Sequence, residues 1–296
     1  MPLKTICVAV SLLAALIPPL YAATVNVFDG SLKTTPDQQG WLYITDPLPP
    51  PLGPGSCASQ SANGAATHLN TNCNIMHAAG YFSRVPPLSH PLMPALDRAA
   101  GFTISFEVQI LNEFHNNNDR AGFSVIVISH DLKGIELGFW EDEIWAQADA
   151  PLFTHAEGGD FDTTKGLMVY RLSLLGDDYF LSADGLTLLS GQLQDYSSFG
   201  NPYDIADFVF LGDDTSSASA SIKVASITHM DHATIVHCDV NGDGVINLND
   251  AILALQVLAG LEPSTPIGRQ VDVNGNGRIG LEEASYIMQK EAGLRQ

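Results

Sequence analysis

Hydrophobic and polar residues alternate in short runs over most of the chain, from about residue 24 to residue 230. The run FTISFEVQI (102–110) carries a hydrophobic residue at every second position, which predicts a strand with one buried face. GFSVIVIS (122–129) is hydrophobic at odd and at even positions, as expected of a strand that is covered on both sides. Further strand-like runs are WLYIT, GIELGFW, LMVYRLSLL, DYFLSAD, LTLLSGQL, DFVFLGD and ASIKVASITHM. About 200 residues of this kind predict a two-sheet antiparallel sandwich.

The strand-like alternation ends near the C-terminus, where one acidic stretch occurs twice. DVNGDGVINLND (Asp239–Asp250) returns 33 residues later as DVNGNGRIGLEE (Asp272–Glu283), and residues 239–261 and 272–294 are identical at 12 of 23 positions. A short helix is predicted after each copy, over Ala251–Ala259 and over Ala284–Ala292. The segment upstream of the second copy contains two prolines, so each unit is one loop followed by one helix.

Both acidic stretches have the ligand spacing of an EF-hand-type calcium loop, with oxygen donors at positions 1, 3, 5, 7 and 12 and glycine at position 6. The first set is Asp239, Asn241, Asp243, the carbonyl of Val245, and Asp250. The second set is Asp272, Asn274, Asn276, the carbonyl of Arg278, and Glu283. Oxygen donors without His or Cys favour calcium, so two Ca²⁺ ions are expected. The alternative is a pair of acidic turns that hold no metal.

The first residues have the pattern of an export signal. Lys4 precedes the apolar run Ile6–Ile17, and small residues follow at Ala22 and Ala23. An apolar core of about 12 residues is too short to span a bilayer, so we expect cleavage rather than anchoring. The predicted organisation is a signal peptide (1–22), a β-sandwich (23–231) and a C-terminal module (232–296), in a secreted or cell-surface protein without a transmembrane anchor.

Charge and cysteine content narrow the possible partners. The formal net charge of −20 disfavours nucleic acid and anionic lipid surfaces as partners. Cys57 and Cys73 lie in a loop rich in Gly, Ser and Asn, and export would permit a disulfide between them. Cys238 is then left over, either as a free thiol or as an intermolecular link.

One stretch of the sandwich carries residues suited to sugar chemistry. In WEDEIW, Glu141 and Glu143 would project from one face of a strand, between Trp140 and Trp145, whose rings could stack on sugars. Paired carboxylates are also the residues that a glycoside hydrolase needs. The simpler interpretation is the solvated outer face of a strand.

Two further polar groups have competing interpretations. His155 and Asp160 could form an acid–base pair or a metal site, and a polar turn is the simpler alternative. The run 116–119 beside Arg120 could hold a structural calcium ion, and a hairpin turn is the alternative. Neither group has the spacing of a known catalytic motif.

The sandwich resembles the extracellular choice-of-anchor domains of bacteria. The resemblance rests on TPDQQGWLYITD, NDRAGFSVIVISHDLKGIELGFWEDEIWAQ, LFTHAEG and LGDDTSSASASIKVASI, and it covers most of residues 24–230. It implies a fold similar to the concanavalin A and laminin G jelly rolls.

The duplicated loop–helix unit, residues 239–294, resembles the dockerin module of cellulosome-type enzymes. The resemblance implies calcium-dependent attachment to a cohesin-like domain on a scaffold or surface. In well-studied dockerins, small hydroxyl residues at loop positions 10 and 11 help to contact cohesin, whereas here those positions are Leu248-Asn249 and Leu281-Glu282. The expected fold class is therefore mainly β: a two-sheet antiparallel jelly-roll sandwich with a small α-helical, dockerin-like module of two calcium loop–helix repeats.

Three functions remain open from the sequence. The first is an exported binding protein whose sandwich takes an extracellular ligand, such as a polysaccharide, and whose tail docks when calcium is bound. The second is a polysaccharide-degrading glycoside hydrolase. The third is a structural surface protein whose calcium sites stabilise its C-terminus.

Overall fold

The computed structural model describes residues 24–184, 186–232, 240, 246–261 and 279–292. The chain divides into two compact units, one formed by residues 22–234 and the other containing residues 235–296. The predicted export signal, Cys238 and most of the predicted calcium ligands lie outside the described residues. Neither helix in the described part of the chain is long and apolar enough to cross a membrane.

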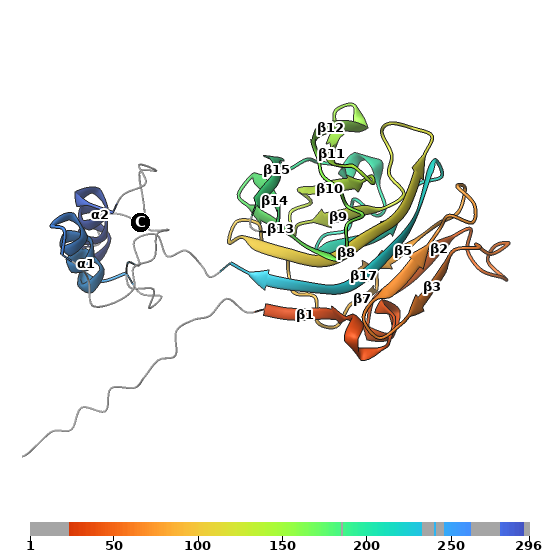
Figure 1. Ribbon diagram of the computed structural model, residues 1–296. Coiled ribbons are helices and arrows are strands. Elements are labelled where there is room, and N and C mark those ends of the chain that lie inside the picture. Colours follow the sequence, from red (N-terminus) through yellow and green to blue (C-terminus); the bar gives the residue numbers. More distant parts are fainter. Residues whose placement is uncertain (1–23, 185, 233–239, 241–245, 262–278, 293–296) are drawn as a thin grey trace, which may run out of the picture. The chain divides into compact units, whose positions relative to one another are not determined.

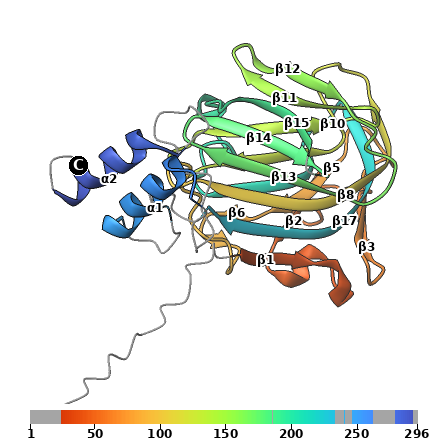
Figure 2. The ribbon, with the colours of Figure 1, turned by 60° about the vertical axis from the view of Figure 1, so that its left-hand side comes forward.

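The larger unit is a sandwich of two antiparallel sheets (Figures 1 and 2). The first sheet has eight strands, in the order β15 (Leu186–Gln192), β14 (Asp178–Ala183), β13 (Met168–Leu175), β8 (Phe102–His115), β17 (Ala218–Asp231), β4 (Thr67–Asn70) and β3 (Ser59–Ala62), with β1 (Thr24–Asp29) also paired to β17. The second has seven, in the order β12 (Leu152–Asp160), β11 (Glu143–Asp149), β10 (Gly134–Phe139), β9 (Ser124–Ile128), β16 (Phe208–Asp213), β5 (Ala78–Phe82) and β2 (Leu42–Asp46). A small hairpin is formed by β6 (Arg84–Val85) and β7 (Leu88–Ser89).

The two sheets meet in one hydrophobic core, which the sequence pattern predicted correctly. The alternating residues of β8, from Phe102 to Ile110, are all buried in it. Strand β9 is buried on both faces, because Val125 and Val127 face the main core while Ile126 and Ile128 belong to a second cluster. This second cluster covers the opposite face of the seven-stranded sheet.

The segment between Cys57 and Cys73 is more ordered than its composition suggested. The structure joins the two cysteines by a disulfide and forms the hairpin β3–β4 between them. Strand β4 pairs with β17, and its Thr67 and Leu69 are buried. The expectation of a plain loop here was wrong, because long-range pairing with β17 supplies hydrogen bonds that local composition does not reveal.

The C-terminal unit contains α1 (Leu248–Leu258) and α2 (Leu281–Glu291). Both begin three residues before the predicted starts. The side chain of Asn247 caps α1 by accepting a hydrogen bond from the Asn249 amide, so the last loop positions already form the first helical turn. The mainly β fold class, with an antiparallel two-sheet sandwich and a small helical C-terminal module, is confirmed.

The packing of the C-terminal unit repeats with the same 33-residue offset as its sequence. Its buried core is Val240, Ala251, Ala254, Ala284 and Ile287, against which Ile246, Leu253, Ile279 and Tyr286 pack. Eight of these nine residues form four pairs: 246 with 279, 251 with 284, 253 with 286, and 254 with 287. The two loop–helix units therefore supply equivalent halves of one core.

Candidate functional site

Asp250 and Glu283, at position 12 of the two acidic loops, are completely buried at the beginnings of α1 and α2. The two carboxylate oxygens of Asp250 accept hydrogen bonds from the amides of Val240 (2.8 Å) and Asn247 (2.9 Å), loop positions 2 and 9. In the second loop, the Glu283 carboxylate accepts from the Gly280 amide at 2.7 Å. Each carboxylate therefore turns back toward its own loop, which is where a position-12 ligand must lie.

The other predicted calcium ligands, Asp239, Asn241, Asp243 and Val245 in the first loop and Asp272, Asn274, Asn276 and Arg278 in the second, lie outside the described residues. Within the described part, the donors fit calcium in type, because both position-12 groups are carboxylates at helix N-termini.

The WEDEIW segment is a hairpin turn, so the prediction that both carboxylates lie on one strand face was wrong. Phe139 pairs with Ile144, and the amide of Trp140 donates to the carbonyl of Glu143 at 2.9 Å. Glu141 therefore lies in the turn, whereas Glu143 begins β11. The segment lacks Gly, Pro and Asn, and Asp142 is its one turn-favouring residue, so the local sequence gave only a weak turn signal.

The two tryptophans of this segment have different environments. Trp145 has no exposed surface, and its ring stacks on His155 at 4.3 Å between centroids. The partly exposed Trp140 stacks on His115 at 4.1 Å and lines a groove with Glu113, Glu141 and Asp142. Of the predicted sugar-stacking pair, Trp140 alone offers surface to a ligand.

His155 and Asp160 lie on strand β12 and not in a polar loop. His155 Nε2 is 3.1 Å from Glu143 Oε1, and the His155 amide donates to the Asp119 carboxylate at 2.8 Å. The run 116–119 connects β8 of the eight-stranded sheet to β9 of the seven-stranded sheet. The alternative of a hairpin turn was therefore wrong, because the two strands that flank the run belong to different sheets. These contacts join three neighbouring segments of the sandwich rim.

A pocket of the sandwich lies on the face of the seven-stranded sheet that is turned away from the main core, and the sequence did not predict it. It has a volume of about 440 Å³. Its floor is formed by the strand residues Gly80, Ile126 and Phe210. Aromatic residues from strands and loops line its walls: Phe82, Phe153, Phe199 and Tyr203.

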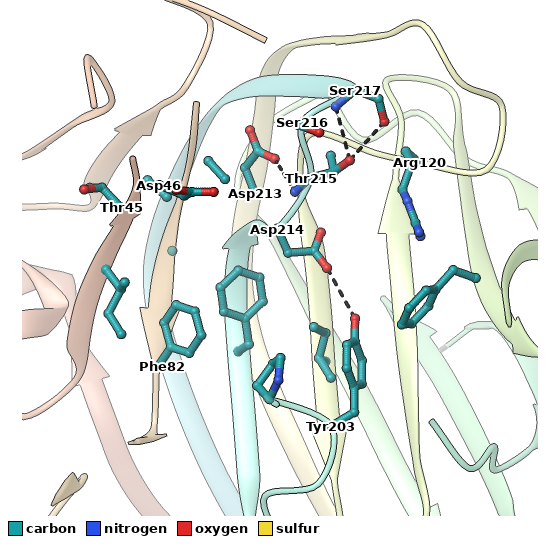
Figure 3. A pocket seen from close by; sticks show the side chains of 18 of the residues that line it. Thr45, Asp46, Phe82, Arg120, Tyr203, Asp213, Asp214, Thr215, Ser216 and Ser217 are labelled. Atoms are coloured by element: carbon teal, nitrogen blue, oxygen red, sulfur yellow. Dashed lines mark hydrogen bonds between the residues drawn. The ribbon is translucent and has the colours of Figure 1, made fainter. Parts of the chain in front are cut away.

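Polar residues gather at one end of this sheet pocket (Figure 3). Asp46 ends β2, Asp213 ends β16, and Asp214 and Thr215 follow in the loop to β17. Arg120 enters from the β8–β9 connection, with its guanidinium 4.8 Å from the centre of the Phe153 ring. The ion pairs found in the described part of the chain include none with Asp46, Asp213 or Asp214. The only sequence signal for this end was the acidic pair that directly follows the buried strand DFVFLG.

Two buried carboxyl groups, those of Glu136 and Asp213, have pKa values well above the ordinary range. Burial raises the pKa of Glu136 to about 8, an effect to which the nearby charge of Asp214 adds. Tyr203 and Gln147 donate hydrogen bonds to the two Glu136 oxygens, at 2.5 and 3.3 Å. Burial likewise raises the pKa of Asp213 to about 8. Asp213 is 2% exposed; its Oδ1 accepts a hydrogen bond from the Thr215 amide, and an interaction with the side chain of Thr71 offsets part of the effect of burial on its pKa.

Two facing glycines shape the floor of the pocket. Gly80 of β5 pairs with Gly212 of β16. A Cβ at position 80 would lie 2.2 Å from the Phe210 ring, and a Cβ at position 212 would lie 2.4 Å from the Gly80 Cα atom. Only glycine lets the two backbones and the Phe210 ring approach this closely.

Comparison with family models identifies the C-terminal unit. Residues 237–289 match the dockerin type I domain, so this β-sandwich protein carries a dockerin type I domain at its C-terminal end. Type I dockerin domains bind calcium, and a dockerin implies partnership with a cohesin. Proteins that contain dockerins are typically extracellular or displayed on the cell surface.

Comparisons of the whole chain give distant likenesses. No curated protein matches the sequence. A carbohydrate esterase of the Shiga toxin-encoding bacteriophage phi24B is 12% identical, covers 72% of this chain and 100% of its own, and has a TM-score of 0.49. A Bacillus subtilis protein of unknown function with a galectin-like fold is 8% identical, with coverages of 71% and 98% and a TM-score of 0.43. A Bauhinia forficata lectin in complex with GalNAc is 12% identical, with coverages of 72% and 99% and a TM-score of 0.38. We draw no functional argument from likenesses at this level.

Proposed function

We propose that the protein is exported and that its dockerin domain, holding two calcium ions, attaches the β-sandwich to a cohesin-like domain on a scaffold or surface. The observation that carries this proposal is the repetition, which extends from the acidic loops into the packing of α1 against α2. Asp250 and Glu283 would bind calcium from equivalent places in the two halves. Calcium would then stabilise the whole module, because its core is too small to be stable alone.

The partner surface of this module would include apolar contacts. Leu248 and Leu281 occupy loop position 10 in the two repeats and are 57% and 58% exposed. Leu255 and Met288, also related by 33 residues, are exposed as well. Exposed apolar residues at equivalent positions are typical of a binding surface. We expect a cohesin-like partner to cover Leu248 or Leu281 where other dockerins present hydroxyl groups.

A capture experiment tests the docking proposal. Immobilised protein is exposed to a panel of cohesin domains in calcium and in chelator, and retention only in calcium is the expected result. Leu248→Asp combined with Leu281→Asp should abolish retention, while Leu186→Asp, an exposed change on the sandwich, should not. Retention that is unaffected by chelator would contradict the proposal.

For the sandwich, we propose binding of an extracellular glycan in the sheet pocket. Aromatic walls suit the apolar faces of sugar rings, while the carboxylates, Arg120 and the hydroxyls of residues 215–217 suit sugar hydroxyls. A glycan array probed with the intact protein tests this, and Tyr203→Ala and Phe82→Ala should reduce the signal. A signal that persists in both variants would place the glycan elsewhere, and the exposed side of Trp140 would then be the next candidate.

A polysaccharide-degrading hydrolase is the second candidate, favoured by Glu136. A carboxyl group with a pKa near 8 next to an open pocket is a feature of general acids. Glu136 has no exposed surface, however, so a glycosidic oxygen would have to be reached through Tyr203. Binding is therefore the better-supported function. A reducing-sugar assay on mixed polysaccharides separates the two, since the binding account predicts no release.

A further inference from the structure

We propose that Cys57, Cys73 and His77 form a metal site that depends on reduction: when a thiol or dithiol reduces the disulfide, the two freed sulfurs and the His77 imidazole bind one zinc ion. None of the three residues lines the sheet pocket, and all three belong to the sandwich rather than to the dockerin domain. The inference is therefore independent of glycan binding and of docking.

Three ligand atoms of the kinds that zinc prefers converge at this point. The sulfur atoms of Cys57 and Cys73 and a ring nitrogen of His77 all lie within 4.8 Å of one another. Zinc binds thiolate and imidazole ligands in tetrahedral sites, and a site with three protein ligands leaves the fourth position to water. Among the described residues, no further Cys, His, Asp or Glu joins this group, so water would complete the coordination.

His77 already presents the lone pair that a metal needs. Its Nδ1 accepts a hydrogen bond from the Cys57 amide at 3.0 Å and lies 3.1 Å from the Cys57 sulfur. Because a backbone amide can only donate, Nδ1 carries no proton in this arrangement. The lone pair therefore faces the side on which the sulfur lies. When zinc takes this lone pair, the adjacent thiolate can accept the amide hydrogen in its place.

The backbone around the two cysteines suits zinc without a large rearrangement. The Cα atoms of Cys57 and Cys73 are 6.1 Å apart. Two thiolates on one tetrahedral zinc ion lie about 3.8 Å apart, given Zn–S bonds of about 2.3 Å. Rotation about the Cα–Cβ bonds opens the sulfurs to that separation while the Cα atoms stay in place. Cys57 lies two residues before Ser59, which pairs with Asn70 in the β3–β4 ladder.

The segment that carries Cys73 and His77 is held by the sandwich and not by the disulfide alone. Thr71 is buried; its amide donates to the Ala220 carbonyl at 2.8 Å, and its hydroxyl accepts from the Ala220 amide at 2.9 Å. The Asn74 amide donates to the Thr71 carbonyl, and the His77 amide donates to the Asn74 carbonyl. These hydrogen bonds do not involve sulfur, so they keep the ligands close together after reduction.

The disulfide is open to a reductant, because Cys57 and Cys73 are exposed and His77 is half-buried. A thiolate of the reductant attacks one sulfur, the S–S bond breaks, and a second thiol displaces the resulting mixed disulfide. The cysteine pair gains two electrons and two protons, and the reductant becomes a disulfide. Zinc then replaces the two thiol protons, which pass to the solvent. The β3–β4 hairpin is thus closed by a covalent bond under oxidising conditions and by zinc under reducing ones.

Cobalt(II) binding to the reduced, calcium-saturated chain tests the inference, because thiolate ligands give cobalt an intense near-ultraviolet band. Cys238→Ser is introduced so that no other thiol of the mature chain contributes. The disulfide is reduced with a phosphine, which is then removed in the absence of oxygen. We expect one cobalt ion per reduced chain, displacement of that ion by zinc, and no thiolate band from the oxidised chain. Zinc should also raise the urea midpoint of the reduced chain.

Variants identify the ligands. His77→Ala should weaken zinc binding by the reduced chain at least about tenfold, since even the outer-shell partners of a metal site contribute that much. Cys57→Ser combined with Cys73→Ser should remove the thiolate band. His130→Ala, which removes an exposed histidine elsewhere on the sandwich, is the matched control and should change neither affinity nor spectrum. Circular dichroism of the oxidised His77→Ala chain checks that the variant is folded.

Three results would overturn the site. A reduced chain that gives no thiolate band with cobalt does not use its cysteines as ligands. Equal zinc affinity of wild type and His77→Ala would show that the imidazole takes no part. Equal binding by the oxidised and the reduced chain would mean that the ion lies elsewhere on this acidic protein.

Discussion

The hydroxyl group of Tyr203 donates a 2.5 Å hydrogen bond to Oε2 of Glu136, a carboxyl group that has no exposed surface. Tyr203 reaches it from the loop between β15 and β16, whereas Glu136 lies on β10. Gln147 of β11 donates to the second oxygen. The Tyr203–Glu136 hydrogen bond therefore connects a loop that lines the sheet pocket to strand β10 of the seven-stranded sheet. It also gives the stability of the sandwich a pH dependence.

We predict that Glu136 lowers the stability of the sandwich as pH rises. Its pKa is about 8 in the folded chain against an ordinary value of 4.5, so the folded state binds more protons between about pH 5 and pH 8. The free energy of unfolding should fall over that window by up to about 1.4 kcal/mol per pH unit from this group. Glu136→Gln should remove that slope.

Urea unfolding followed by tryptophan fluorescence measures this effect. All three tryptophans, at positions 41, 140 and 145, lie in the sandwich, so the signal reports on that unit alone. Glu107→Gln, on the polar face of β8, serves as a matched control and should keep the wild-type slope. Equal slopes for wild type and Glu136→Gln would show that Glu136 ionises normally.

Gly80→Ala should destabilise the sandwich, by about 1–3 kcal/mol, because the new methyl group would overlap the Phe210 ring. Gly166→Ala is the control, since a Cβ there meets nothing within 4 Å. Urea midpoints of the two variants decide the matter. A Gly80→Ala protein as stable as Gly166→Ala would mean that the pocket floor can rearrange at little cost.

Loss of the Cys57–Cys73 disulfide should cost about 3 kcal/mol, because the bond closes a 16-residue separation and constrains the unfolded chain. The double variant Cys57→Ser, Cys73→Ser should unfold at lower urea than the wild type. Adding a reductant should bring the wild type to the level of the variant, whose own midpoint should not move. Two free thiols in exported protein, found by non-reducing peptide mapping, would refute the bond.

The sequence predicted those features whose signal is local and periodic. The alternation in β8 gave its buried face, and the unbroken apolar run of β9 gave its burial on both sides. The repeated acidic loops gave the position and type of the C-terminal module. Both helices begin earlier than predicted, because residues of the loops already cap them: Asn247 and the carboxylate of Asp250 cap α1, and the carboxylate of Glu283 accepts from the Gly280 amide at the start of α2.

The sheet pocket could not be predicted in the same way, because its residues meet only through the fold. Arg120, Phe153, Tyr203 and Asp214 come from four separate connections or strand ends, each unremarkable in its own sequence context. The prediction that WEDEIW forms a strand was wrong for the converse reason. Its alternation looked like a strand, but the pairing of Phe139 with Ile144 makes it a turn, and that pairing is set by neighbouring strands.

We predict that the dockerin domain holds two calcium ions with unequal affinity. The first loop offers three carboxylates, Asp239, Asp243 and Asp250, and the second offers two, Asp272 and Glu283. More anionic ligands generally bind calcium more tightly, so the first loop should hold the tighter ion. Because residues of both repeats pack in one shared core, we expect that calcium must occupy both loops before the two helices form fully.

Calorimetric titration of the metal-free chain with calcium is the most direct test. The account predicts two ions per chain and a gain of helical circular dichroism as they bind. Asp239→Ala should remove the tighter event, and the matched change Asp272→Ala, 33 residues later, the weaker one. Binding of one ion or none, or a helical signal that calcium leaves unchanged, would contradict the account.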